Sequence, residues 1–149
     1  MEWIDRLNRA VDYLEEHLKD PDLQEAARIA CCSPYHFQRM FTLLAGMPLS
    51  EYLRRRRMSR AAVDLQSGAK IVDVALSYGY SSPTAFNRSF QTVHGLPPSQ
   101  AKRPGARLKS HPPLRFAITV QGVEEMEYRI EKRGPFRVVG VSAPLNKDM

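Results

Sequence analysis

The chain has 149 residues, of which 43% are hydrophobic and 26% charged, and its formal net charge is +6. This length and composition allow one or two small hydrophobic cores and exclude a chain that is disordered throughout. No segment approaches the run of about 20 apolar residues that crosses a bilayer, and the acidic start is not typical of a secretory signal. We therefore expect a cytoplasmic protein with no membrane partner.

The charge is unevenly distributed along the sequence. Residues 1–32 carry 4 basic and 8 acidic side chains, residues 33–115 carry 13 and 3, and residues 116–149 carry 5 of each. The strongly basic middle segment favours a polyanionic partner, and a solvated basic face is the alternative.

The first 32 residues predict two helices. Apolar residues at a 3-4-3-4 spacing indicate an amphipathic helix over about residues 3–19, which Pro21 ends. Asp22, with Glu25 three residues later, resembles the capping box of a second, short helix that should reach about residue 30.

The two cysteines, Cys31 and Cys32, are neighbours in the sequence. Adjacent cysteines rarely form a disulfide, and they cannot make a metal site without other ligands. We expect at least one of them to fill a small core position at the end of the second helix, and a redox or thiol-metal sensor is the alternative.

Residues 33–50, SPYHFQRMFTLLAGMPLS, occur again 49 positions later as SPTAFNRSFQTVHGLPPS, with 8 identities in 18 positions. Each copy opens with Ser-Pro, which can cap and begin a helix. Each closes with a glycine suited to a left-handed C-terminal turn and a proline that can begin the next helix. The two copies predict helices over residues 34–45 and 83–94, with two phenylalanines on the buried face and an arginine on the polar face.

A short predicted helix precedes each copy, over residues 22–30 and 71–77. A short helix, a tight turn and a second helix make a helix-turn-helix, whose second helix enters the DNA major groove. Residues 49–66 lack Gly and Pro, carry four successive arginines and predict a helix of about 27 Å. Such a connector can hold two reading helices about one DNA turn, 34 Å, apart, so that one chain fills two successive major grooves. At most two of the four arginines can face DNA together, because successive helical residues point about 100° apart.

The composition changes after Gln100. Residues 102–115 contain three prolines, a glycine and, counting His111, six basic side chains, which is typical of a linker. We expect a solvated tether there, with a phosphate contact as the alternative. Residues 116–122, 126–131 and 136–141 predict strands that bury little surface, so this tail should be the start of another domain. It either pairs with something outside the chain or packs onto the first domain, and its open strand edges also suggest self-association.

The predicted fold is therefore mainly α: two helix-turn-helix subdomains joined by a long linker helix, with a short C-terminal β segment. We divide the chain into a DNA-binding domain over residues 1–103, a linker over 104–115 and a truncated β segment over 116–149.

Sequence-specific DNA binding needs side chains that bond base edges and others that contact phosphates. The early turns of the two reading helices should expose Tyr35, His36, Gln38 and Arg39 in the first copy and Thr84, Ala85, Asn87 and Arg88 in the second. Gln can bond adenine in two places, and Arg can bond guanine likewise. The second copy has fewer long polar side chains, so it should discriminate bases less sharply. The alternative for Arg39 and Arg88 is an ion pair with a neighbouring carboxylate.

The segments SPYHFQRMF and SPTAFNRSF, the helix EYLRRRRMSRAAVDL and the stretch ALSYGYSSPTAFNRSFQTVHGLPPSQ resemble the DNA-binding domain of AraC/XylS transcription regulators, over residues from about 5 to 103. This resemblance implies a transcription regulator that acts as an activator. Such a regulator binds an asymmetric double-stranded DNA site and contacts RNA polymerase. It implies that base contacts come from Tyr35, Gln38, Arg39, Thr84, Ala85 and Arg88. Phosphate contacts are assigned to Ser33, His36, Arg55, Ser82 and Asn87. The tail MEYRIEKRGPFRVVGVS resembles the start of a GyrI-like effector-binding domain.

An enzyme is not indicated. The four histidines are scattered, and neither a nucleophile motif nor a Gly-rich phosphate loop after a strand is present. We expect no catalytic residues, no metal site and no cofactor. The rival function is a basic helical nucleic-acid-binding or adaptor protein without sequence specificity, although the absence of an aromatic strand platform argues against common single-stranded RNA readers.

Overall fold

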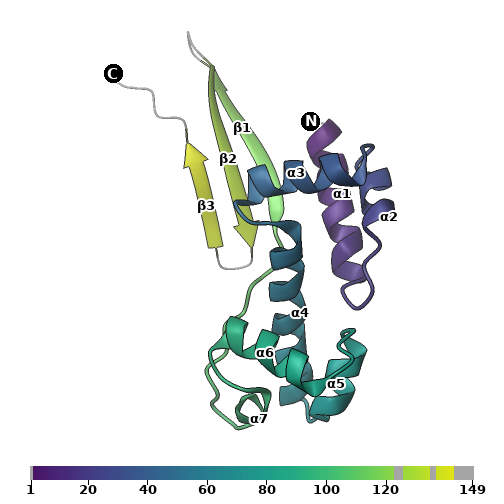
Figure 1. The fold of residues 1–149 in the computed structure, drawn as a ribbon. Coiled ribbons are helices and arrows are strands. Elements are labelled where there is room, and N and C mark those ends of the chain that lie inside the picture. The colour runs from purple at the N-terminus through teal and green to yellow at the C-terminus, as the bar shows by residue number, and fades with distance from the viewer. Residues whose placement is uncertain (1, 123–125, 135–136, 143–149) are drawn as a thin grey trace. The chain divides into compact units, whose positions relative to one another are not determined.

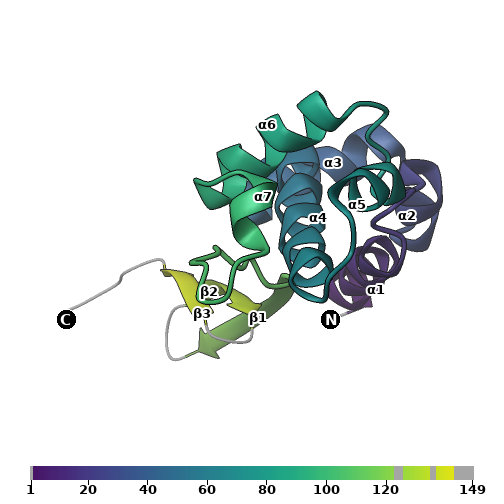
Figure 2. The same cartoon turned by 90° about the horizontal axis from the view of Figure 1, so that it is seen from below.

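The computed structural model describes residues 2–122, 126–134 and 137–142. Within them the chain forms helices and then a small sheet (Figures 1 and 2). The helices are α1 (Glu2–Glu16), α2 (Leu23–Ile29), α3 (Pro34–Ala45), α4 (Leu49–Gln66), α5 (Ile71–Ser77), α6 (Pro83–His94) and α7 (Pro98–Ala101). The strands are β1 (Arg115–Gly122), β2 (Met126–Gly134) and β3 (Arg137–Ser142). The predicted mainly α fold with a short C-terminal β segment is confirmed.

The helices of the repeat begin and end where the sequence signals predict. The side-chain oxygens of Ser33 and Ser82 each accept a hydrogen bond from the backbone N–H three residues later, at 3.1 and 3.2 Å. Gly46 and Gly95 take the left-handed conformation after the last turn, with φ of 77° and 78°. Each serine cap is worth about 1 kcal/mol. Two other helices are shorter than predicted: α1 ends at Glu16, where residues 17–20 continue in turns and a bend, and α2 spans Leu23–Ile29 instead of 22–30.

The turns inside the two helix-turn-helix units have the same backbone hydrogen bonds. The N–H of Cys32 donates to the carbonyl oxygen of Ala27 at 3.0 Å, and the N–H of Tyr80 donates to that of Ala75 at 2.9 Å. This is the Schellman pattern, which needs a left-handed residue just before the donor. Gly79 takes that place in the second unit with φ 86°, but a cysteine takes it in the first, with φ 62°.

The expectation that a cysteine fills a core position is wrong. Cys31 is exposed and Cys32 is only half-buried, and both thiols are free. The turn places the side chain of the left-handed residue outside the helix pair, so Cys31 has no core position to fill.

Substituting Cys31 with glycine should raise the free energy of unfolding by about 0.5–1 kcal/mol. An L-residue pays about 1–2 kcal/mol in the left-handed region, and glycine avoids this at a smaller entropic cost in the unfolded chain. The matched change Gly79→Ala should lower stability by about 1 kcal/mol through backbone strain alone, because its Cβ would meet only the Lys19 carbonyl oxygen at an ordinary 3.6 Å. Urea unfolding measures both. Cys31→Ala, which keeps the strain and removes the thiol, is the control and should change stability little.

The chain folds into two compact units. Unit 1 takes its described residues from segments 1–13, 23–48 and 112–149, and unit 2 from segments 14–22 and 49–111. Unit 1 contains α3 and unit 2 contains α6, the helices of the two copies, and each unit buries the two phenylalanines of its helix completely. In unit 2 these are Phe86 and Phe90, which pack in one core with residues of α4 and α5, and their ring centroids are 5.7 Å apart.

Strand β1 begins within unit 1 and is fixed to α1. The side-chain amide of Asn8 both accepts from the N–H of Phe116 at 2.8 Å and donates to its carbonyl oxygen at 2.9 Å. The Phe116 ring packs edge-on against Phe41 of α3, with centroids 5.8 Å apart. Of the two alternatives for the tail, the start of β1 therefore packs onto the first helix-turn-helix unit. The three strands form one antiparallel sheet in the order β1-β2-β3.

The segment that joins the last helix to β1 is anchored, so the expected solvated tether is wrong for residues 108–111. The N–H of Lys109 donates to Nδ1 of His94 at 3.0 Å, and the N–H of His111 donates to Oγ of Ser59 at 2.8 Å. Leu108 packs against the core of unit 2. Buried polar side chains on α4 and α6 satisfy the backbone of this segment, and composition alone cannot reveal such distant partners.

Candidate nucleic-acid interface

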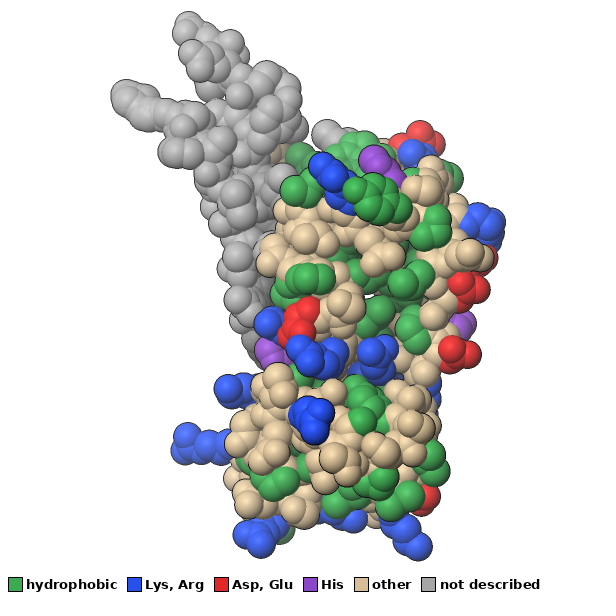
Figure 3. All heavy atoms as spheres, viewed as in Figure 1, with side chains coloured by type: hydrophobic (Ala, Val, Ile, Leu, Met, Phe, Trp, Pro, Cys, Tyr) green, Lys and Arg blue, Asp and Glu red, His purple; other side chains and the backbone are tan. Residues whose placement is uncertain are grey.

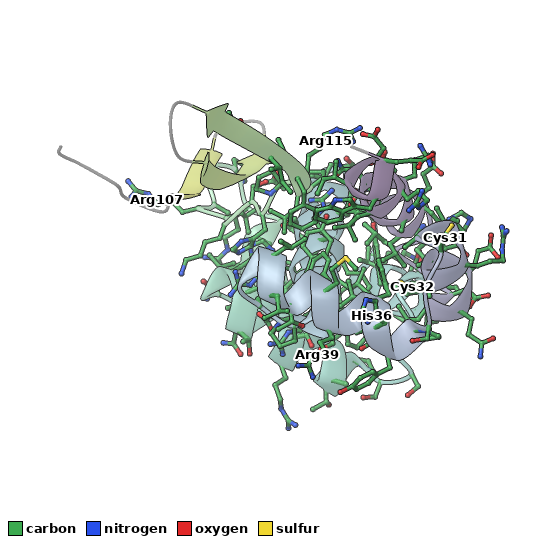
Figure 4. All side chains as sticks on the ribbon, turned by 90° about the horizontal axis from the view of Figure 1, so that it is seen from above. Cys31, Cys32, His36, Arg39, Arg107 and Arg115 are labelled. Atoms are coloured by element: carbon green, nitrogen blue, oxygen red, sulfur yellow. The ribbon has the colours of Figure 1, made fainter. Side chains whose placement is uncertain are left out.

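The polar face of α3 presents the side chains predicted for the first reading helix. Tyr35, His36, Gln38 and Arg39 are all exposed, whereas Phe37 on the opposite face is fully buried. His36 and Arg39 lie on the outer side of the helix (Figure 4). The helix therefore separates its packing residues from side chains that can bond bases or phosphates.

Arg39 contacts a neighbour on the same helix. Its guanidinium donates to the hydroxyl of Tyr35, one turn earlier, at 3.3 Å. Among the ion pairs of the described residues none involves Arg39 or Arg88, so the carboxylate alternative is not what the structure has. Both charges are available for an anionic partner.

Helix α6, the second predicted reading helix, is similar in plan but offers smaller side chains. Thr84, Ala85, Asn87 and Arg88 are exposed, and Phe86 is fully buried. Of these four side chains, Arg88 is the single long polar one, as the sequence predicted. Fewer base-edge hydrogen bonds are available to this helix than to α3.

The serine caps limit what Ser33 and Ser82 can do as predicted phosphate contacts. Each side-chain oxygen already accepts a backbone hydrogen bond in its own helix. A hydroxyl keeps its own proton as a donor, so a phosphate oxygen can still be bound. Ser33 is exposed, while Ser82 is half-buried.

The four successive arginines of α4 have different environments. Arg56 is buried and pairs with Glu15, with Nε 2.8 Å from Oε1. Arg54 and Arg55 both bond Glu51, and Nε of Arg55 lies 3.0 Å from its carboxylate. Arg55, a predicted phosphate contact, is thus half-exposed and partly neutralised within its own helix.

Basic side chains surround unit 2 on the face shown in Figure 3, where Lys and Arg predominate over Asp and Glu.

Glu51 is the carboxylate that bonds two of the α4 arginines. Although burial raises the pKa of Glu51, hydrogen bonds from Arg55 and Arg54 outweigh this effect and hold that pKa below its usual range. Glu51 therefore stays ionised and orients these two guanidinium groups.

The comparisons with known proteins agree with this geometry. A family described as "Helix-turn-helix domain" matches residues 26–104, which begin in α2 and end after α7. Among solved structures, one similar protein is a transcriptional regulator from Chromobacterium violaceum, described as one of the AraC-type DNA-binding domain-containing proteins. The match has a TM-score of 0.61 and 25% identity, and it covers 68% of this chain and 96% of that one. This chain belongs to the AraC-type helix-turn-helix family.

Two curated relatives and a second solved structure extend the AraC-type match. The HTH-type transcriptional activator AarP of Providencia stuartii is 38% identical over 78 residues, covering 52% of this chain and 58% of AarP. The transcriptional regulator Rob of Salmonella typhimurium is 36% identical over 108 residues, covering 70% of this chain and 37% of Rob. The crystal structure of the DNA-binding domain of AdpA, in complex with a target DNA, has a TM-score of 0.57 and 28% identity, covering 66% of this chain and 96% of that one. The present chain thus spans between about a third and three fifths of these two curated relatives.

Two further features of the described part of this AraC-type chain concern membranes and metals. None of its helices is long and apolar enough to cross a bilayer. In the same residues, no three or more His, Cys, Asp or Glu side chains gather into a group that can hold a metal ion.

His94, at the end of α6, has a structural role that was not predicted from the sequence. The buried ring accepts the Lys109 N–H at Nδ1, so its own proton lies on Nε2, which bonds the carbonyl oxygen of Met58 at 2.9 Å. Burial lowers the pKa of His94, although the Met58 carbonyl opposes this; the nearby Lys109 charge also lowers it. The available sequence signal was its position four residues after Phe90, which itself follows Phe86 by four, because this spacing extends the buried stripe of α6.

We expect the stability of unit 2 to fall as the pH decreases below about 6.5, the ordinary histidine value. The unfolded chain then binds a proton that folded His94 resists, so unfolding is favoured down to the lowered folded-state pKa. The loss is at most about 1.4 kcal/mol per pH unit. Urea unfolding between about pH 7.5 and pH 5.5 measures it. His94→Gln should flatten the dependence, and His36→Gln, a change at an exposed position, should not; equal pH slopes in all three proteins would contradict this assignment.

Proposed function

We propose that this AraC-type chain is a sequence-specific DNA-binding transcription regulator, acting as an activator, that inserts α3 and α6 into two successive major grooves. The single observation that carries the proposal is the repeated design of the two helices. Each is capped by Ser-Pro and ended by glycine, buries two phenylalanines and turns an uncompensated arginine outward. The DNA complex of AdpA and the activator AarP are consistent with this role.

The proposed contacts follow from exposure and chemistry. Bases are read by Tyr35, Gln38, Arg39, Thr84, Ala85 and Arg88. Phosphates are bound by Ser33, His36, Arg55, Ser82 and Asn87. Arg39 and Gln38 have the strongest capacity for discrimination, because each can make two hydrogen bonds to one base.

The connector supports binding by a single chain. Helix α4 is unbroken over 18 residues, which corresponds to about 27 Å. A connector of this length suits half-sites that lie about 34 Å apart, one turn of B-form DNA. We infer an asymmetric site bound by one molecule, because the two reading helices carry different side chains.

The resemblance to AraC/XylS regulators carries the remaining inferences. We infer that the protein contacts RNA polymerase and is cytoplasmic. We also infer that residues 1–103 form the DNA-binding domain and that a GyrI-like domain begins after the linker. The family match ends at residue 104, which supports that boundary. Self-association through the strands of 116–149 is the further hypothesis for the tail, because the outer strands β1 and β3 each pair on one side only.

The decisive experiment compares Arg39→Ala with Arg55→Ala on a selected duplex and on a scrambled one. Arg39→Ala should weaken binding to the selected duplex by about 1–3 kcal/mol and relax one base position. Arg55→Ala should weaken binding to both duplexes equally and reduce the salt dependence. Arg9→Ala, a change to an exposed arginine of α1, is the control.

The rival function, binding by charge alone, gives a different result when the same comparison is made over a range of salt concentrations. A charge-only binder has no preference for the selected duplex at any salt concentration, and Arg39→Ala then weakens both duplexes alike. Either outcome would overturn sequence-specific binding.

A further inference from the structure

Leu43 is an apolar side chain on the face of α3 that is otherwise polar. Its relative exposure is 76%, the highest among the large hydrophobic residues that the structure describes. Single exposed leucines are common on protein surfaces. This one differs from them in its position, because it lies on the proposed first reading helix.

The helical spacing places Leu43 on the same side as the reading residues. Tyr35, Arg39 and Leu43 follow one another at intervals of four residues, and all three are exposed. Residues four apart lie nearly above one another on a helix, while Phe37 and Phe41 occupy the buried side. A surface that is contacted by Arg39 is therefore within reach of Leu43.

The distance between the two side chains corresponds to a small number of base pairs. Four residues of helix rise about 6 Å, and stacked base pairs are about 3.4 Å apart. A helix that lies along the groove thus brings Leu43 to a base about two pairs away from the one that Arg39 reads.

The chemistry of the major groove leaves one suitable contact for this side chain. The groove edges carry hydrogen-bond donors and acceptors, and their one apolar group is the C5-methyl of thymine. We propose that Leu43 reads the C5-methyl group of a thymine in the half-site of α3, about two base pairs from the base bound by Arg39. This inference rests on the proposed DNA-binding function and adds to it a specificity residue outside the six proposed base contacts.

The second copy supports a difference between the half-sites. Thr92 occupies the position equivalent to Leu43, and its hydroxyl donates to the carbonyl oxygen of Arg88 at 2.8 Å. A threonine buries less apolar surface than a leucine. The strongest methyl dependence is therefore expected in the half-site of α3.

Replacing single thymines by deoxyuridine in a selected duplex tests the proposal, because this change removes only the methyl group. At one position in the α3 half-site, the wild-type protein should bind about fourfold more weakly, which corresponds to about 0.8 kcal/mol for one buried methyl-sized group. Leu43→Ala should bind the thymine duplex more weakly and should no longer distinguish thymine from uracil at that position. Leu43→Met should retain the distinction.

Leu76→Ala is the matched control, because Leu76 is also an exposed leucine, at 61%, but lies on the supporting helix α5. It should leave the thymine preference unchanged. The proposal is overturned if no uracil substitution weakens wild-type binding, or if Leu43→Ala still distinguishes the two bases.

Two other outcomes also decide the matter. If Leu43→Ala changes the oligomeric state by light scattering and leaves DNA affinity unchanged, Leu43 contacts protein and the inference is wrong. If no duplex is preferred over a scrambled one, the proposed function fails as a whole, and the Arg39→Ala comparison distinguishes this from failure at Leu43 alone.

Discussion

Phe41→Ala and Phe90→Ala should each lower the free energy of unfolding by about 3–5 kcal/mol. Both rings are fully buried, and each lies at the same position of its copy of the repeat. Phe41 contacts Phe116 edge-on at 5.8 Å, while Phe90 lies 4.3 Å from the His94 ring, measured between centroids. Removal of either ring leaves a cavity that the surrounding helices can fill only in part.

The two substitutions should act on different units. Hydrogen exchange should become faster in α2 and α3 for Phe41→Ala and in α5 and α6 for Phe90→Ala, since local stability follows local packing. Val63→Ala, at an exposed site on α4, is the control for an apolar truncation without a cavity. A loss below about 1 kcal/mol at either phenylalanine would contradict the assignment of these residues to the cores.

Glu15→Gln should lower the free energy of unfolding by about 3 kcal/mol, because it leaves the charge of Arg56 buried without a counter-charge. The Arg56 side chain is only 8% exposed, and the Glu15 carboxylate also pairs with Arg60 at 3.4 Å. The Arg56 guanidinium in addition donates to the carbonyl oxygen of His111 at 2.6 Å. The substitution should therefore also weaken the attachment of the segment before β1.

Glu16→Gln is the matched control for this change, because Glu16 is the next residue and is exposed. It should alter stability by less than about 0.5 kcal/mol. Urea unfolding of the two variants gives the comparison, and limited proteolysis reports on residues 102–111. Equal stability of the two variants would show that the pair with Arg56 contributes little.

Much of the candidate site followed from local signals. The bounds of α3 and α6 were predicted to the residue, since Ser-Pro at the start and glycine at the end are read within one helix. The six side chains assigned to base contacts are exposed, because the paired phenylalanines leave the opposite face to solvent. The exposure of Leu43, on which the proposed thymine contact rests, was not predicted, although its spacing of four residues from Arg39 was visible in the sequence.

The environments of the α4 arginines could not be predicted in the same way. Four neighbouring arginines look alike in the sequence, and only one of them, Arg56, is buried. Its partner Glu15 is 41 residues away. Which arginine is neutralised depends on how the helices pack, and no periodicity within α4 specifies it.

The sequence by itself determined the helices, their caps and the duplicated polar faces of α3 and α6, because hydrophobic spacing and capping act over a few residues. Tertiary structure alone decided the ion pair of Arg56, the anchoring of residues 108–111 and the attachment of β1. The bond between Asn8 and Phe116 joins residues 108 positions apart. A buried polar group must find a partner wherever the folded chain brings one, and that requirement is met only once the units are packed.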